Sequence, residues 1–270
     1  MYAGITLSKR SGRIVGVHQK IDRVARRELN KFIPKNSFFP SAKNIIHFEG
    51  INGPDALKHV NKSEDVPWHF IDPKNIHSSN LLNIISDHMR NLTKALKEDN
   101  KERSAFEASW MAHAVVDGLS PPHHYPLDEK IEELWGKPQS KRNSIKDKGL
   151  IRGENSIDTI SKNWQYWGGG GVMMAHVMFE MGVSSAIAGD KFKKNGPSRN
   201  DIIVLKKVGF EIMFLDSLSK IDSLKMYDSY YKNGWTRSLA SKTRKELIPE
   251  IIKTVVLAWY QALILAEKEK

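Results

Sequence analysis

Residues 108–126 read ASWMAHAVVDGLSPPHHYP, and the rest of the chain is organised around this stretch. If the part before the prolines is helical, Trp110, His113 and Asp117 fall on one stripe, because residues three and four apart share a helix face. An imidazole and a carboxylate on a core-facing stripe are costly to bury unless they are paired or bind a cation. The two prolines end the helix and turn the chain, so that His123 can return toward the same pocket. The spacing suits a metal site, and a buried, hydrogen-bonded histidine is the alternative.

The composition is that of a globular protein with a strong positive charge. Of the 270 residues, 40% are hydrophobic and 27% are charged, and the net charge is +11 with a pI near 9.6. Such a charge favours anionic partners, although many proteins are basic for solubility alone. Because cysteine is absent, disulfides and thiolate metal sites are excluded. Any metal ion must bind His, Asp, Glu or backbone groups, which favours zinc or another first-row divalent ion.

Helical hydrophobic patterns account for most of the chain, and there is no convincing strand pattern or internal repeat. We expect helices over residues 14–32, 79–98, 104–118, 128–136, 200–219 and 244–268. Residues 33–80 carry many prolines and glycines and are expected to be irregular. Residues 136–171 are expected to be a loop insertion rich in basic residues and glycine, in which four glycines at 168–171 separate two helical patterns. The predicted fold class is all-α, a single-domain multi-helix bundle over residues 1–270.

The last third of the chain offers core candidates but little that suggests chemistry. The apolar residues expected to face the core are Ile203, Ile212, Leu215, Leu247, Ile251, Trp259 and Leu263. Between the two long helical patterns, residues 226–237 read MYDSYYKNGWTR and are interpreted as an aromatic and basic loop without an assigned role.

Further histidines and acids could join the central pair. His176 and Glu180 repeat the spacing of four on another core-facing stripe, and His18 points inward from the first helix. A lone inward histidine is more often a satisfied core residue than a ligand, and Asp55 after Gly53-Pro54 could simply cap a short helix. Two histidine–carboxylate pairs in one cysteine-free chain are much better evidence for metal binding than one.

Taken in order, these residues resemble the ligand series of the zinc-dependent phospholipase C and single-strand nuclease superfamily. The matching positions are His18, Asp55, His69, His113-x-x-x-Asp117, His123 and His176-x-x-x-Glu180. The resemblance spans residues 14 to about 185, and it includes the Pro121-x-His123 step and the sequence HFIDPKN that begins at His69.

The resemblance implies a multinuclear zinc site between the helices. One zinc ion would be held by Asp55, His69, His113 and Asp117, with Asp117 bridging to a second ion that is also held by His18. A third would be held by His123, His176 and Glu180. Asp55 and Asp117 would act in catalysis, Asp55 by orienting or deprotonating the attacking water and Asp117 by bridging the metal pair.

Two departures from the family pattern leave parts of this site open. Family members usually complete the second zinc site with the amine and carbonyl of the mature N-terminal residue, typically Trp, whereas here Met1 stands seventeen residues before His18. Two or three zinc ions are therefore expected. The segment between His123 and His176 is longer than in the family, and His124 is the alternative ligand to His123.

The predicted function is hydrolysis of phosphate esters by a zinc-dependent enzyme. Glu180 favours the phospholipase branch, because the nuclease branch usually has Asp there. A single-strand nuclease is the first alternative, and a non-catalytic, basic metal-binding helical protein is the second. Aromatic residues beside the metals would favour the nuclease, because single-stranded bases bind by stacking; the candidates are Trp68, Phe70, Trp164, Tyr166 and Trp167.

The expected partner is an anionic phosphodiester, either a phospholipid or single-stranded nucleic acid, with peripheral membrane contact as an option. No transmembrane segment is expected, because the most apolar run, residues 254–266, is short and contains Gln261. The first residues lack the apolar core of a secretory signal. We therefore expect a cytoplasmic protein, or a secreted one if a leader precedes this sequence.

Overall fold

The computed structural model describes Met1 and residues 16–49, 52–55, 70–78, 80–125, 127–137 and 150–268. Its α-helices are α1 (Val17–Leu29), α2 (Ala42–His47), α4 (Leu81–Lys97), α5 (Lys101–Gly118), α6 (Leu127–Trp135), α8 (Ser156–Trp167), α9 (Val172–Ile187), α10 (Arg199–Val208), α11 (Phe210–Ser223), α12 (Met226–Asn233), α13 (Arg237–Lys242) and α14 (Ile248–Lys268). Short 3-10 helices, η2 (Ile76–Ser78) and η3 (Pro121–His124), and a π-helical segment, η5 (Thr243–Leu247), complete the description. Within these residues the only extended pairing is an isolated bridge between Asp72 and Asn75. The all-α prediction is confirmed.

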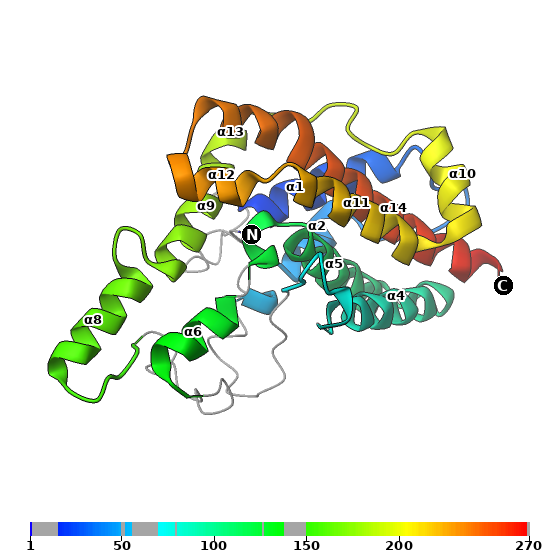
Figure 1. The fold of residues 1–270 in the computed structure, drawn as a ribbon. Coiled ribbons are helices and arrows are strands. Elements are labelled where there is room, and N and C mark those ends of the chain that lie inside the picture. Colours follow the sequence, from blue (N-terminus) through cyan, green and yellow to red (C-terminus); the bar gives the residue numbers. More distant parts are fainter. Residues whose placement is uncertain are drawn as a thin grey trace.

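The long C-terminal helix α14 lies at the centre of the bundle. It packs against α1, α4, α5 and α11, and Figure 1 shows these helices running beside it. Trp259 is fully buried, and its Nε1 donates a hydrogen bond to the carbonyl oxygen of Ala108 on α5 at 2.8 Å. The bond satisfies the polar atom of a large apolar side chain, whose burial contributes roughly 2–3 kcal/mol.

Helix α5 is buried on nearly every side and forms the rigid base of the candidate site. Its N-terminus is capped by Asn100, whose Oδ1 accepts a hydrogen bond from the Arg103 amide at 3.0 Å. At its C-terminus a Cβ on Gly118 would lie 2.4 Å from Leu81 Cδ2 and 3.0 Å from Phe214 Cζ. Glycine at this position therefore allows α4 and α11 to approach the end of α5.

A second, smaller core lies under α6 and α8, which project from the main bundle (Figure 1). Its buried members are Ile131, Trp135, Ile151 and Tyr166. Within the predicted insertion over 136–171, residues 156–167 form α8, which is the helical pattern predicted before the glycines at 168–171. The helix begins at Asn155, whose Oδ1 accepts from the Asp158 amide at 2.9 Å, and Tyr166 anchors it in the small core.

The boundaries of the other helices agree in part with the sequence prediction. Helices α1, α4, α5 and α6 lie where they were expected, and α2 begins at the Ser41 cap inside a region predicted to be irregular. The pattern at 200–219 is two helices, because Gly209 has a φ of +81° and interrupts the chain. Residues 226–233 were predicted as loop and instead form α12, which buries Met226 and Tyr227.

The core prediction for the last third of the chain is correct for Leu247 and for the residues of α14, holds in part for Leu215, which packs against the core, and is wrong for Ile203 and Ile212. Leu247, Ile251, Trp259 and Leu263 are buried, and Leu215 is half-buried. Ile203 and Ile212, by contrast, are 64% and 56% exposed. The neighbouring Ile202 and Met213 face the core instead.

Two helical stretches have the length and composition of a membrane span. In Ser156–Ile187, 33% of the most apolar 18-residue stretch is buried inside the protein. In Arg237–Lys268 the corresponding share is 78%. The second includes the core helix α14, and the first is interrupted by the glycines at 168–171. Such stretches are weak evidence and do not establish a transmembrane segment.

Candidate metal centre

The centre is built on the C-terminal half of α5 and the turn that follows it. His113 and Asp117 lie one helical turn apart and are both buried. Pro121 and Pro122 open the 3-10 helix η3, in which the His123 amide donates to the Ser120 carbonyl at 2.9 Å. This turn reverses the chain and places the His123 ring beside Asp117.

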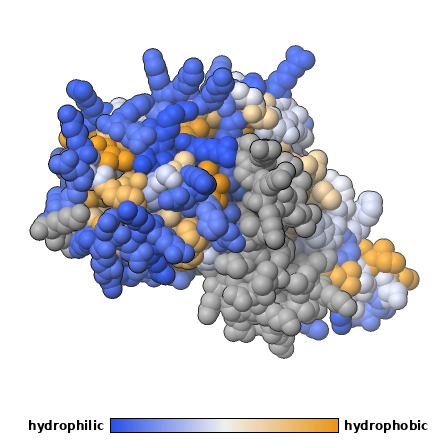
Figure 2. Space-filling view, turned by 180° about the vertical axis from the view of Figure 1, so that it is seen from behind, coloured by the Kyte–Doolittle hydropathy of each residue, from blue (hydrophilic) through white to orange (hydrophobic). Residues whose placement is uncertain are grey.

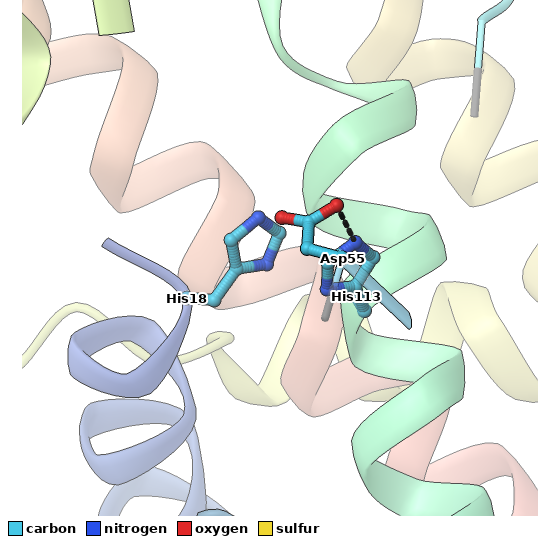
Figure 3. A group of neighbouring side chains, drawn as sticks. All are labelled: His18, Asp55 and His113. Carbon is cyan, nitrogen blue, oxygen red and sulfur yellow. Dashed lines mark ion pairs between the residues drawn. The ribbon is translucent and has the colours of Figure 1, made fainter. Parts of the chain in front are cut away.

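A first group of ligand-type atoms comes from His18 on α1, Asp55 and His113. These atoms all lie within 4.8 Å of one another, and Figure 3 shows the three side chains converging. The rings of His18 and His113 stack at 4.1 Å with an interplanar angle of 10°. Nε2 of His113 lies 3.6 Å from Oδ1 of Asp55, whose side chain is 32% exposed. Asp55 therefore forms the open side of an otherwise buried group.

A second group comes from His123, His176 and Glu180, whose ligand-type atoms also lie within 4.8 Å of one another. Oε1 of Glu180 is 3.3 Å from Nε2 of His123 and 3.2 Å from Nε2 of His176. His176 and Glu180 are one turn apart on α9, so a rigid helix presents both toward the same point. The second predicted histidine–carboxylate pair thus faces the first across a short distance.

Asp117 joins the two groups. Its Oδ2 is 3.1 Å from Nε2 of His113, and its Oδ1 is 3.2 Å from Nε2 of His18 and 3.9 Å from Nε2 of His123. Opposite oxygens of one carboxylate therefore face different imidazoles. This geometry fits the bridging role that was predicted for Asp117.

Met1 supplies backbone atoms to the centre. Its amine forms an ion pair with Asp117 and lies 3.2 Å from Oε1 of Glu180, and its carbonyl oxygen is 2.7 Å from Nε2 of His18. The sequence left open whether a residue so far before His18 could reach this site. In the structure the backbone atoms of Met1 lie beside His18, Asp117 and Glu180.

Charges inside the centre shift several pKa values. Burial alone would raise the pKa of Asp117, but the Met1 amine, His123 and His113 hold it well below its usual range. Burial would also raise the pKa of Glu180, and the Met1 amine and His176 keep it well below the usual value. Burial lowers the pKa of His123 to about 4. Both carboxylates are therefore anionic and His123 is neutral near pH 7, which are the forms that bind metal ions.

The Met1 amine carries the opposite charge. Burial would lower its pKa, but Asp117, Glu180 and Asp55 raise it to about 10. The ammonium thus balances two buried carboxylates. A metal ion could take over this balancing charge only if the amine gave up its proton.

Two further acids that the sequence analysis did not select lie behind His113. Oε1 of Glu49 is 3.0 Å from Nδ1 of His113, and both side chains are fully buried. Burial, together with the negative charge of Glu49, raises the pKa of Asp22 well above its usual value. Glu49 lies just after α2, and its distance in the sequence from the other site residues matches no recognisable motif. Only its spatial position identifies it.

The donor set fits divalent metal ions. Imidazoles and carboxylates are the ligands that zinc uses in the absence of cysteine. Glu49 binds Nδ1 of His113 and leaves Nε2 directed at the carboxylates, an arrangement typical of metal-bound histidines. The described residues thus contain two groups, joined by Asp117, that could hold metal ions.

The remaining predicted residues are placed as follows. His69 and Trp68 lie outside the described residues. His124 points away from the centre, since its Nε2 is hydrogen-bonded to the Gly118 carbonyl at 2.9 Å, so His123 is the histidine of this pair that joins the metal-ligand group. Asp55 ends the described segment 52–55, in which residues 54 and 55 are helical.

The aromatic candidates separate clearly. Phe70 stacks on His123 with ring centroids 4.9 Å apart and therefore lies at the centre. Tyr166 is buried in the small core, whereas Trp164 and Trp167 are exposed on α8. Of the described candidates, Phe70 alone stacks on a ligand-group histidine.

A cavity of about 570 Å³ opens beside His123. Its charged lining residues are Asp72, Lys74, Glu129, Asp222, Lys225 and Asp228. Four carboxylates thus stand against two lysines, which makes the cavity acidic in a protein with a net charge of +11. The basic character of the chain does not extend to this wall.

No protein-family model, curated protein or solved structure significantly matches the chain.

Proposed function

We propose that the chain is a zinc-dependent hydrolase of phosphate diesters, most closely similar to phospholipase C enzymes. The observation that carries the proposal is the position of Asp117, one carboxylate in contact with histidines from both ligand groups. A shared carboxylate is how metal ions are held a few ångströms apart in two-metal phosphoesterases. The order of residues from His18 to Glu180 supports the same assignment.

The chain's own residues account for positioning and proton transfer. Zinc ions held here would polarise the phosphoryl oxygens and activate water as a nucleophile. Asp55, the partly exposed acid of the first group, would orient the water and accept its proton. The new bond joins the water oxygen to phosphorus, and the ester P–O bond breaks. The oxygen of the leaving group takes up a proton and departs as an alcohol, so that atoms and charge balance.

The acidic cavity favours a phospholipid substrate over a nucleic acid. A polyanionic strand would be repelled by four carboxylates beside His123, whereas a lipid contributes a single phosphodiester. Glutamate at position 180 also favours a phospholipid substrate, because the nuclease branch usually has aspartate there. Phe70 is the observation that favours the nuclease alternative, because its ring next to His123 could stack on a base.

The test is hydrolysis by the zinc-loaded protein of a monomeric short-chain phospholipid and, separately, of single-stranded DNA. We expect release of phosphorylated head group and little DNA cleavage, with activity abolished by a chelator and restored by zinc. Asp55→Asn should lower the rate by about 100-fold or more. The matched control is Asp87→Asn, which changes an exposed carboxylate on α4. Faster cleavage of DNA would support the nuclease, and metal binding without hydrolysis of either substrate would support the non-catalytic alternative.

A further inference from the structure

The outer face of α8 is the most exposed apolar surface among the described helices. Ile157, Ile160, Trp164 and Trp167 are 80%, 70%, 73% and 40% exposed. Their spacing of three, four and three residues places all four on one side of the helix. A soluble helix normally turns such a stripe toward the core. Here the stripe faces outward, while Tyr166 alone of the helix is fully buried.

Hydrogen bonds from the flank and the inner face of α8 fix this orientation. Asn163 accepts a hydrogen bond from the Ile151 amide at 3.0 Å and donates one to its carbonyl at 2.6 Å. Thr159 accepts from the Gly153 amide at 2.9 Å. Asn163 and Thr159 thus bind α8 to the backbone of the segment that precedes it. Rotation of the apolar stripe toward the core would break these hydrogen bonds. The outward stripe is built into the fold.

The helix also stands apart from the main bundle. Figure 1 shows α8 projecting at one end of the molecule, and Figure 2 shows apolar surface gathered at that projecting end. The neighbouring helix α9 adds exposed Met178 and Met181. A protruding amphipathic helix can enter the boundary between lipid headgroups and acyl chains without other parts of the protein colliding with the bilayer.

We propose that the exposed face of α8 binds a phospholipid membrane surface. Two of its four apolar residues are tryptophans, whose amphipathic rings favour the membrane–water interface. The stripe is too small for a stable contact with a second copy, because specific protein interfaces usually involve roughly 20–30 residues on each side. The net charge of +11 on the whole chain complements anionic lipid headgroups, while next to α8 the exposed Arg152 is accompanied by the exposed Glu154.

The position of α8 links this surface to the metal centre. The glycines at 168–171 connect α8 directly to α9, whose second and third turns carry His176 and Glu180. A bilayer bound by α8 would therefore lie near the second ligand group. Membrane binding rests on the surface of α8 alone and would remain valid if the proposed hydrolysis were not observed.

The experiment is co-sedimentation of the full chain with vesicles of phosphatidylcholine containing about one quarter phosphatidylglycerol. We expect the wild-type protein to sediment with these vesicles, and less with pure phosphatidylcholine. The double substitution Ile160→Ser and Trp164→Ser should weaken binding by about tenfold or more. The matched control is Ile203→Ser with Ile212→Ser, which removes two comparably exposed isoleucines from α10 and α11 and should leave binding unchanged. Thermal unfolding confirms that both variants are folded.

Three results would overturn the proposal. The first is a wild-type protein that stays in the supernatant with both vesicle types. The second is equal loss of binding in the α8 variant and the control, which would indicate nonspecific apolar adsorption. The third is a dimer in analytical ultracentrifugation that only the α8 variant dissociates, which would assign this face to a second copy. Sedimentation in the presence of a chelator measures binding without turnover, so failure here is distinct from failure to hydrolyse a phosphate ester.

Discussion

Nδ1 of His113 lies 3.0 Å from Oε1 of Glu49, with both side chains fully buried, and Nε2 of the same ring faces Asp117 at 3.1 Å. The histidine is thus held from behind by one carboxylate while its other nitrogen faces the ligand group. Carboxylates in this position orient a metal-bound histidine and increase its basicity. Glu49 therefore belongs to the candidate metal centre as the residue that orients His113.

Replacing Glu49 by glutamine should weaken zinc binding without unfolding the chain. The amide keeps the volume but loses the charge that orients His113, and such changes typically cost 10–100-fold in metal affinity. Competition with a chromophoric chelator measures the change. Glu107→Gln is the control, because Glu107 is equally buried and contacts His88 at 2.6 Å, a histidine outside both ligand groups. Equal zinc affinity in the Glu49 variant and the wild type would contradict this role.

The two ligand groups should lose metal separately. Glu180→Gln removes an acid from the second group, whereas His18→Ala removes an imidazole from the first. We expect elemental analysis to show a lower zinc content in each variant, and the zinc lost from one to be retained by the other. Loss of all metal in both variants would instead indicate a single cooperative site.

Glu250 should make the fold sensitive to acid. Burial would raise its pKa, but hydrogen bonds from Lys220 at 2.5 Å and Ser217 at 2.9 Å, and Lys253 at 2.6 Å, hold the pKa below its usual value. The folded state therefore favours the ionised form. The resulting stability is present above the pKa of an unfolded glutamate, about 4.5, and is lost as the pH falls through the lower folded value.

Glu250→Gln should remove this dependence. At pH 7 the variant should be less stable by about 1–3 kcal/mol, and the difference should shrink between pH 5 and pH 3. Urea unfolding at several pH values measures the free energy of unfolding. A difference that stays constant over this range would show that ionisation of Glu250 does not contribute.

Gly182→Ala in α9 should destabilise the protein, although alanine normally favours a helix over glycine by about 1 kcal/mol. A Cβ at this position would lie 2.4 Å from Cε3 and 2.6 Å from Cδ2 of Trp235. Because an indole ring is rigid, the contact must be relieved by moving α9 or the ring, at roughly 1–3 kcal/mol. Ser185→Ala, on an exposed position of the same helix, provides the comparison. A higher melting temperature for Gly182→Ala would contradict the close packing.

The sequence was sufficient for features that depend on residue spacing. The pairs His113–Asp117 and His176–Glu180 are each one helical turn apart, so their shared direction follows once the helices are known. The turn at Pro121 likewise follows from the chemistry of proline. The approach of these pairs to one another depends on how α5 and α9 pack, which spacing alone does not determine.

Other features required the packed structure. Glu49 was missed because its partner lies 64 residues away in the chain, and no local pattern marks it. The exposed stripe of α8 was missed because Trp164 and Ile160 suggest burial by their type, whereas Tyr166 and the hydrogen bond of Thr159 hold the other face inward. Ile203 was also misplaced, since the adjacent Ile202 is the residue of that pair that faces the core.

The most direct test of the central claim is the zinc content and phosphodiesterase activity of Asp117→Asn beside the wild type. The account predicts two or three zinc ions per wild-type chain. In the variant it predicts loss of at least one ion and of activity by about 100-fold or more, since Asp117 faces both ligand groups. A wild-type protein that takes up no zinc on reconstitution, or a variant that retains its full metal content and activity, would contradict it.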